Sequence, residues 1–129
     1  KINMTIVDNT IKKIKELKKP GTDLILGLPE SYWYSLNQID TESIAKELKI
    51  PMLIAQGTAD FQVYADKDYV AWQKLFKDKK NVTFKLYDNL NHLFMKSVLN
   101  GAFDLNEYNT PGEIDKKVIK DIAEWIKNN

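Results

Sequence analysis

Two side chains suited to acid–base chemistry each follow an apolar segment of this sequence. Asp60 comes shortly after an apolar run over residues 50–55, and His92, the single histidine, comes shortly after residues 82–87. A carboxylate that holds one imidazole nitrogen fixes the tautomer of the ring and stabilises the imidazolium, as a general base requires. Taken singly, each residue also has an ordinary explanation as a loop or turn residue. The chemistry therefore requires a fold that brings the two side chains together.

The segments before these two residues have the patterns of parallel strands in an α/β protein. Residues 50–55 are continuously apolar, which is typical of a strand covered on both faces. Residues 82–87 alternate, which predicts a strand with one apolar and one more polar face, at or near a sheet edge. A helix expected over 66–78 connects them, and strands joined by such a crossover are nearly always parallel. Because parallel strands end at one sheet edge, we expect the carboxylate and the imidazole to emerge together.

Two helices are expected near the ends of the chain. Residues 4–19 have apolar residues at helical spacing and lysines on the other side, and Pro20-Gly21 ends the helix. The lysine-rich side is either a solvated face or a surface for a partner or a membrane. Pro111-Gly112-Glu113 is expected to open the last helix. The apolar stripe of this helix consists of Ile114, Val118, Ile119, Ile122, Trp125 and Ile126.

The segment between the first helix and the first strand is the least regular. A Gly/Pro break precedes three adjacent aromatic residues, Tyr32, Trp33 and Tyr34, called the aromatic cluster below. These side chains either line a pocket for an apolar ligand or cover a core. Asp40 or Thr41 is then expected to cap a short helix. The residues that this helix is expected to bury are Ile44, Ala45 and Leu48.

Composition argues against several classes of function. The 129 residues suffice for one core, 43% of them are apolar, and no apolar run approaches the roughly 18–20 residues of a membrane span. Nineteen lysines against eighteen acidic residues leave a net charge of +1, and arginine is absent, which argues against nucleic-acid binding. With no cysteine and one histidine, we expect neither a metal site nor a cofactor. The compartment stays open, because a core of this size can lack disulfides on either side of a membrane.

Three segments resemble the α/β-hydrolase family. In residues 50–63 an apolar strand runs into Gly-x-x-Asp, which resembles the seventh-strand segment of that family. Residues 81–94 resemble the last strand and histidine loop, and residues 121–126 resemble the final helix. Within the family, the chain is most similar to bacterial serine hydrolases of the esterase, lipase and dienelactone-hydrolase-like groups. The resemblance implies the C-terminal part of an α/β-hydrolase fold.

The resemblance also implies roles for particular residues. Asp60 matches the acid of the catalytic triad and His92 its base, in a hydrolase of carboxylic esters or amides. Residues 1–40 would form a helical lid or cap, and residues 41–129 the C-terminal core portion. The aromatic cluster would help to shape the pocket for a small-molecule substrate.

The nucleophile that this family requires is absent from the sequence. The family places it before the acid on a G-x-S-x-G turn, and no such turn occurs here. The serines, none of which has the flanking glycines, are Ser31, Ser35, Ser43 and Ser97. We therefore expect the nucleophile, which in a relative of this fold could also be Cys or Asp, and the oxyanion hole to lie in a missing N-terminal half. By itself this chain is not expected to turn over substrate.

Two further expectations follow from the missing half. The strand over residues 50–55 would lack a neighbour, so the isolated chain is expected to associate by swapping or by pairing with that half. A competing hypothesis is a non-catalytic binding or assembly module that retains part of the hydrolase fold. Its contact surfaces would be the lysine-rich helix and the aromatic cluster.

Overall fold

The structure, a computed structural model, describes residues 4–129. The chain divides into two compact units, Lys1–Glu47 and Leu48–Asn129, which are described separately below. Residues 1–3, with which the expected lid segment begins, lie outside the described residues. The mixture of helices and small sheets is compatible with the predicted α/β class. No helix within residues 4–129 is both long and apolar enough to cross a membrane.

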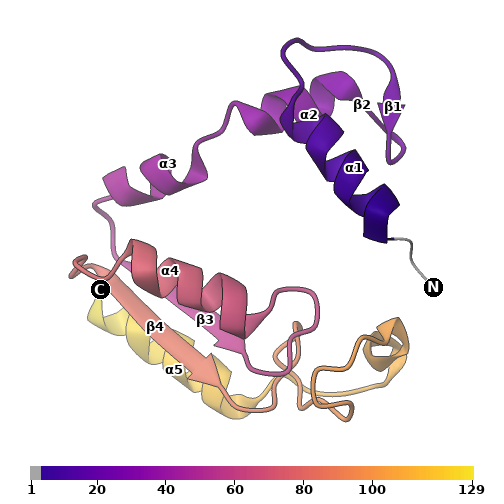
Figure 1. The fold of residues 1–129 in the computed structure, drawn as a ribbon. Coiled ribbons are helices and arrows are strands. Elements are labelled where there is room, and N and C mark those ends of the chain that lie inside the picture. The colour runs from indigo at the N-terminus through magenta and orange to yellow at the C-terminus, as the bar shows by residue number, and fades with distance from the viewer. Residues whose placement is uncertain (1–3) are drawn as a thin grey trace. The chain divides into compact units, whose positions relative to one another are not determined.

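The first unit consists of three helices and a short hairpin (Figure 1). Its elements are α1 (Met4–Lys15), β1 (Leu24–Ile25), β2 (Leu28–Pro29), α2 (Glu30–Asn37) and α3 (Thr41–Glu47). The first helix ends at Lys15 and not at Lys19 as predicted. A carbonyl of its last turn is satisfied by a residue outside the helix, because the Asn37 side-chain amide donates to the Ile14 carbonyl at 2.6 Å.

The hairpin and α2 occupy the segment whose pattern the sequence left unresolved. Strands β1 and β2 pair antiparallel around a turn in which Leu26 and Gly27 have φ of 52° and 79°. Both turn residues are left-handed, as a two-residue hairpin turn requires. Helix α2 is joined to this hairpin by Trp33, whose indole N–H donates to the Ile25 carbonyl at 2.9 Å.

Helix α3 is capped as predicted but buries less than predicted. The Asp40 carboxylate accepts from the backbone N–H of Ser43 at 3.0 Å, which confirms Asp40 as the cap. Of the three apolar residues expected to be buried, Ala45 is 8% exposed, whereas Ile44 and Leu48 are exposed. A helix of seven residues makes fewer than two full turns, so a narrow stripe suffices to attach it.

The second unit is built on a two-stranded parallel sheet. Its elements are β3 (Met52–Gly57), a π-helical turn η1 (Ala65–Tyr69), α4 (Val70–Leu75), β4 (Val82–Tyr87), a 3-10 turn η2 (Leu105–Asn109) and α5 (Lys116–Asn128). Met52 pairs with Val82 and Gly57 with Tyr87, so the predicted parallel pairing is confirmed. The crossover predicted as one helix over 66–78 is the turn η1 followed by α4.

Helices cover opposite faces of this sheet (Figure 1). On one face, Phe84 meets Tyr69 of η1 edge to face, with ring centroids 5.5 Å apart. Neighbouring residues of β4 point the other way, where the Trp125 indole of α5 donates to the Thr83 hydroxyl at 3.1 Å. The more polar face of β4 is therefore covered by α5 through hydrogen-bonding side chains.

The core lies between the sheet and α5. It is built around Tyr87, Leu90 and Val118, with Ala55, Phe94 and Ile122 packed against them. Residues 52–55 are half-buried and not fully buried as a strand covered on both faces would be. Within the described residues β3 pairs only with β4, so its other edge has no strand partner.

The last helix begins later than predicted and buries a narrower stripe. It starts at Lys116, because the Asp115 carboxylate accepts from the backbone N–H of Lys117 at 2.7 Å and so forms the cap. Ile114 precedes the helix. The stripe residues that remain exposed are Ile114, Ile119 and Ile126.

Candidate active site

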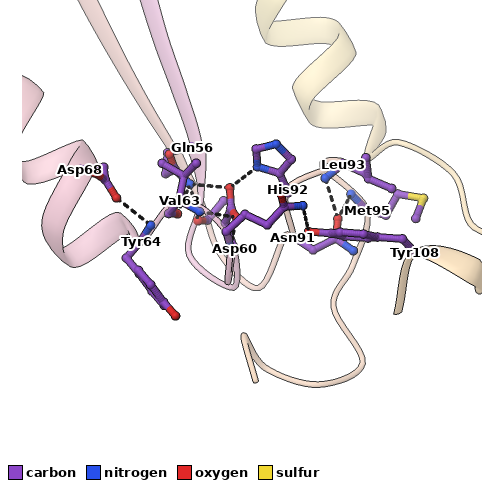
Figure 2. Close-up of polar contacts among 12 residues, drawn as sticks. Gln56, Asp60, Val63, Tyr64, Asp68, Asn91, His92, Leu93, Met95 and Tyr108 are labelled. Carbon is purple, nitrogen blue, oxygen red and sulfur yellow. Dashed lines mark hydrogen bonds and ion pairs between the residues drawn. The ribbon is translucent and has the colours of Figure 1, made fainter. Parts of the chain in front are cut away.

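The structure brings Asp60 and His92 together at the carboxyl ends of β3 and β4. Imidazole Nδ1 of His92 lies 2.8 Å from carboxylate Oδ2 of Asp60 (Figure 2). The Asp60 side chain is 5% exposed and the His92 side chain 42% exposed. The pair thus has a buried acid and an imidazole that solvent or a ligand can reach.

The carboxylate of Asp60 is held by four donors. Oδ1 accepts from the backbone N–H groups of Gln62 at 2.9 Å and Val63 at 3.0 Å. Oδ2 accepts from the Gln56 side-chain amide at 2.9 Å in addition to facing His92. Burial acts to raise the pKa of this carboxyl, but hydrogen bonds from Val63, His92 and Gln62 outweigh burial and lower the pKa. Asp60 is therefore ionised at neutral pH.

An ionised Asp60 determines which nitrogen of His92 carries the proton. A carboxylate can only accept a hydrogen bond, so the 2.8 Å contact requires that Nδ1 be the donor. In the neutral imidazole, Nε2 then carries the lone pair. Figure 2 shows the ring of His92 with its Nδ1 edge toward Asp60. The arrangement leaves a basic nitrogen on the side away from the acid.

Backbone hydrogen bonds join the two loops that carry the pair. The N–H of Thr58 donates to the Tyr87 carbonyl at 2.9 Å, and the N–H of Ala59 donates to the Leu90 carbonyl at 3.0 Å. Gly57 lies directly against Leu90, so that a Cβ at this position would overlap the Leu90 carbonyl oxygen. The close approach of the acid turn to the histidine loop therefore depends on a glycine at the end of β3.

The histidine loop is folded around the side chain of Asn91, which is 1% exposed. The side-chain carbonyl of Asn91 accepts from the N–H groups of Leu93 at 3.0 Å and Met95 at 3.1 Å (Figure 2). Asn89 and Phe94, on either side of this turn, have φ of 53° and 56°, which non-glycine residues adopt uncommonly. The surrounding contacts thus hold His92 in a tightly constrained turn.

The aromatic cluster lies on α2 in the first unit, whereas Asp60 and His92 lie in the second. Tyr32 and Trp33 meet edge to face, with ring centroids 5.1 Å apart, and the Trp33 indole is bonded to the hairpin. Tyr32 is 45% exposed. Trp33 thus packs within its own unit, and Tyr32 presents a ring at the surface.

Three of the four serine hydroxyls donate hydrogen bonds to nearby oxygens. The hydroxyls of Ser35, Ser43 and Ser97 donate to Ser31 O, Asp40 Oδ2 and Glu107 Oε1, respectively. No group of three potential metal ligands occurs among the described residues. The Asp60–His92 contact is an arrangement suited to acid–base chemistry.

Three polar residues with hydrogen bonds to the acid or to the histidine loop were missed from the sequence. Gln56 lies at the carboxyl end of β3, a position where a polar residue in an apolar strand could have indicated a role. Asn91 precedes the histidine, but nothing in the pattern distinguishes it from a turn residue. Glu107 lies in a stretch without periodicity and gave no signal at all.

Comparison with known proteins finds that the chain is similar to part of an esterase. The chain is 39% identical over 118 residues to Esterase EstD from Thermotoga maritima. This alignment includes 92% of the chain but only 28% of EstD, so the chain spans less than a third of that relative. No protein-family model matches the chain, and no solved structure matches it.

Proposed function

We propose that this chain is the part of an α/β-hydrolase that supplies the acid and the histidine of a Ser-His-Asp triad for the hydrolysis of carboxylic esters. The observation that carries the proposal is the 2.8 Å contact between His92 Nδ1 and the buried Asp60. The similarity to an esterase supports an ester, with an amide as the other substrate of this chemistry.

Each residue of the pair has a defined task in this reaction. His92 Nε2 takes the proton of the nucleophile's hydroxyl as its oxygen attacks the ester carbonyl, and later returns a proton to the leaving alcohol. Asp60 holds Nδ1–H and stabilises the imidazolium that forms in between. The nucleophile and the oxyanion hole come from residues outside this chain.

A lid or cap over the substrate is the role that we propose for the N-terminal segment with α1, the β1–β2 hairpin and α2. The proposed lid spans residues 1–40, with the core portion over 41–129. The exposed ring of Tyr32 supports a contribution of the aromatic cluster to an apolar part of the substrate pocket.

The test is turnover of a p-nitrophenyl ester by the full-length protein. We expect His92→Ala to lower kcat by several orders of magnitude and Asp60→Asn to lower it by about four orders, because the wrong tautomer is then favoured. Asp66→Asn, an exposed aspartate in η1, is the matched control and should retain kcat.

Near-full turnover by either variant would remove that residue from the triad. If the full-length protein had no esterase turnover, the competing hypothesis of a binding or assembly module would replace the proposal.

A further inference from the structure

We infer that Glu107 is a positioning residue that sets the geometry of the His92 loop through Asn91. This inference rests on the proposed function, because it assigns to Glu107 a part in holding the triad histidine. Glu107 lies in η2, whereas Asn91 lies in the loop after β4. The two segments meet in a buried polar network.

Three donors converge on the Glu107 carboxylate, which is 5% exposed. Oε1 accepts from the Ser97 hydroxyl at 2.6 Å and from the backbone N–H of Val98 at 3.2 Å. Oε2 accepts from the Asn91 side-chain amide at 3.1 Å. A carboxylate can accept all of these hydrogen bonds at once, which no neutral side chain of this size can do.

The carboxylate fixes the orientation of the Asn91 amide. The side-chain carbonyl of Asn91 already accepts from the N–H groups of Leu93 and Met95, so its NH2 group must point the other way. There it meets Glu107. A flip of the amide would place its NH2 group against the N–H groups of Leu93 and Met95, and its carbonyl oxygen against the Glu107 carboxylate. Because Leu93 follows His92 directly, the orientation of Asn91 determines the backbone path of the residue next to the imidazole.

The free-energy cost of burying the Glu107 carboxylate argues that the network has a role besides packing. A buried carboxylate loses hydration that an apolar side chain of similar volume would not lose, so stability alone favours an apolar residue here. A carboxylate can only accept hydrogen bonds, so each neighbouring group must turn a donor toward it. It thereby fixes the orientation of those groups. Directional order is what a catalytic histidine requires of its supports.

Glu107→Gln replaces the carboxylate by an amide of nearly the same shape, which cannot accept all three hydrogen bonds. If the glutamine carbonyl stays with Ser97 and Val98, its NH2 group faces the NH2 group of Asn91. If the amide is reversed, its NH2 group faces the N–H of Val98. Either orientation leaves a donor without an acceptor, so the loop must shift.

The double variant Asn91→Asp/Glu107→Gln reverses the network without breaking it. The new aspartate accepts from Leu93, Met95 and the glutamine amide, and the glutamine carbonyl accepts from Ser97 and Val98. Glu113→Gln, at an exposed glutamate ahead of α5, is the matched control.

The experiment combines ester turnover by the full-length protein with NMR of the His92 Nδ1 proton, which is assigned by its absence from His92→Ala. We expect Glu107→Gln to lower kcat by about 10²-fold with KM within twofold, and to weaken or shift the Nδ1 proton signal. Asn91→Asp/Glu107→Gln should recover at least tenfold in kcat, and Glu113→Gln should match wild type.

Three results would overturn the inference. One is wild-type kcat and proton signal in Glu107→Gln. Another is a loss of kcat with an unchanged proton signal, since the effect would then bypass His92. The last is a loss that the double variant fails to recover. The proton signal does not depend on turnover, so full activity of His92→Ala would refute the proposed function without deciding the role of Glu107.

Discussion

At the scale of single residues, the site is defined by how an anionic side chain is kept ionised while it is buried. Asp60 has four hydrogen-bond donors around two oxygens, and its lowered pKa follows from them in spite of burial. The Asp60 carboxylate thus holds the backbone of the turn after β3 and also contacts His92.

Asp60→Asn is expected to lower the free energy of unfolding by about 1–3 kcal/mol at neutral pH, because the amide turns a donor toward some of those donors. The folded-state pKa of Asp60 is lowered, so its stabilising contribution is present above the unfolded-state value of about 3.9 and is lost as pH falls through the folded-state pKa. The difference between wild type and variant should therefore shrink below about pH 4. Urea unfolding of the full-length protein over a pH series measures this difference.

Asp66→Asn is the control for this series and should follow the wild-type curve. A difference between wild type and Asp60→Asn that stayed constant or grew under acid conditions would contradict the assignment of a lowered pKa to Asp60.

The positions of Asp60 and His92 were predictable because each follows a strand with a clear pattern. Parallel strands end at one edge, and few loop residues separate each side chain from its strand. Glu107 was not predictable, because its role arises from contacts with Asn91 and Ser97, which no local periodicity records. Residues that support a site through tertiary hydrogen bonds leave no regular spacing in a sequence.

At the scale of elements, the close packing of the end of β3 against the histidine loop depends on Gly57. An added methyl group there would overlap the backbone carbonyl of Leu90, which cannot rotate away as a side chain can. Gly57→Ala is expected to lower the free energy of unfolding by about 1–3 kcal/mol and to weaken the His92 Nδ1 proton signal. Chemical unfolding and NMR of the variant measure the two effects.

Gly112→Ala is the matched control for this substitution. Its added methyl group would first meet Sδ of Met95 at 2.9 Å, the far end of a flexible side chain that can move. We expect a change within about 0.5 kcal/mol. Wild-type stability and an unchanged proton signal in Gly57→Ala would show that the two loops do not need this close approach.

The strands and their parallel pairing were predictable, whereas several helix boundaries were not. Strand β4 follows the alternation of its residues, and the crossover rule fixes its direction relative to β3. The end of α1 is set by Asn37, which is remote in the sequence, and the start of α5 by the Asp115 cap. Apolar spacing reports which face of a helix is buried but not which side chains end it.

At the scale of the whole molecule, one edge of β3 has no strand partner within the part of the chain that the structure describes. Within the described residues β3 pairs only with β4, and residues 52–55 of β3 are half-buried. The expectation that the isolated chain associates, or pairs with a missing N-terminal half, stays a prediction.

We propose that Asp60 and His92 activate a serine outside residues 1–129. The most direct measurement is fluorophosphonate labelling of the full-length protein, with the labelled residue located by mass spectrometry. We predict one labelled serine outside these residues, and labelling slowed by orders of magnitude in His92→Ala. Labelling of His92→Ala at the wild-type rate, a label on a serine of this chain, or no labelling of the active wild-type protein would contradict it.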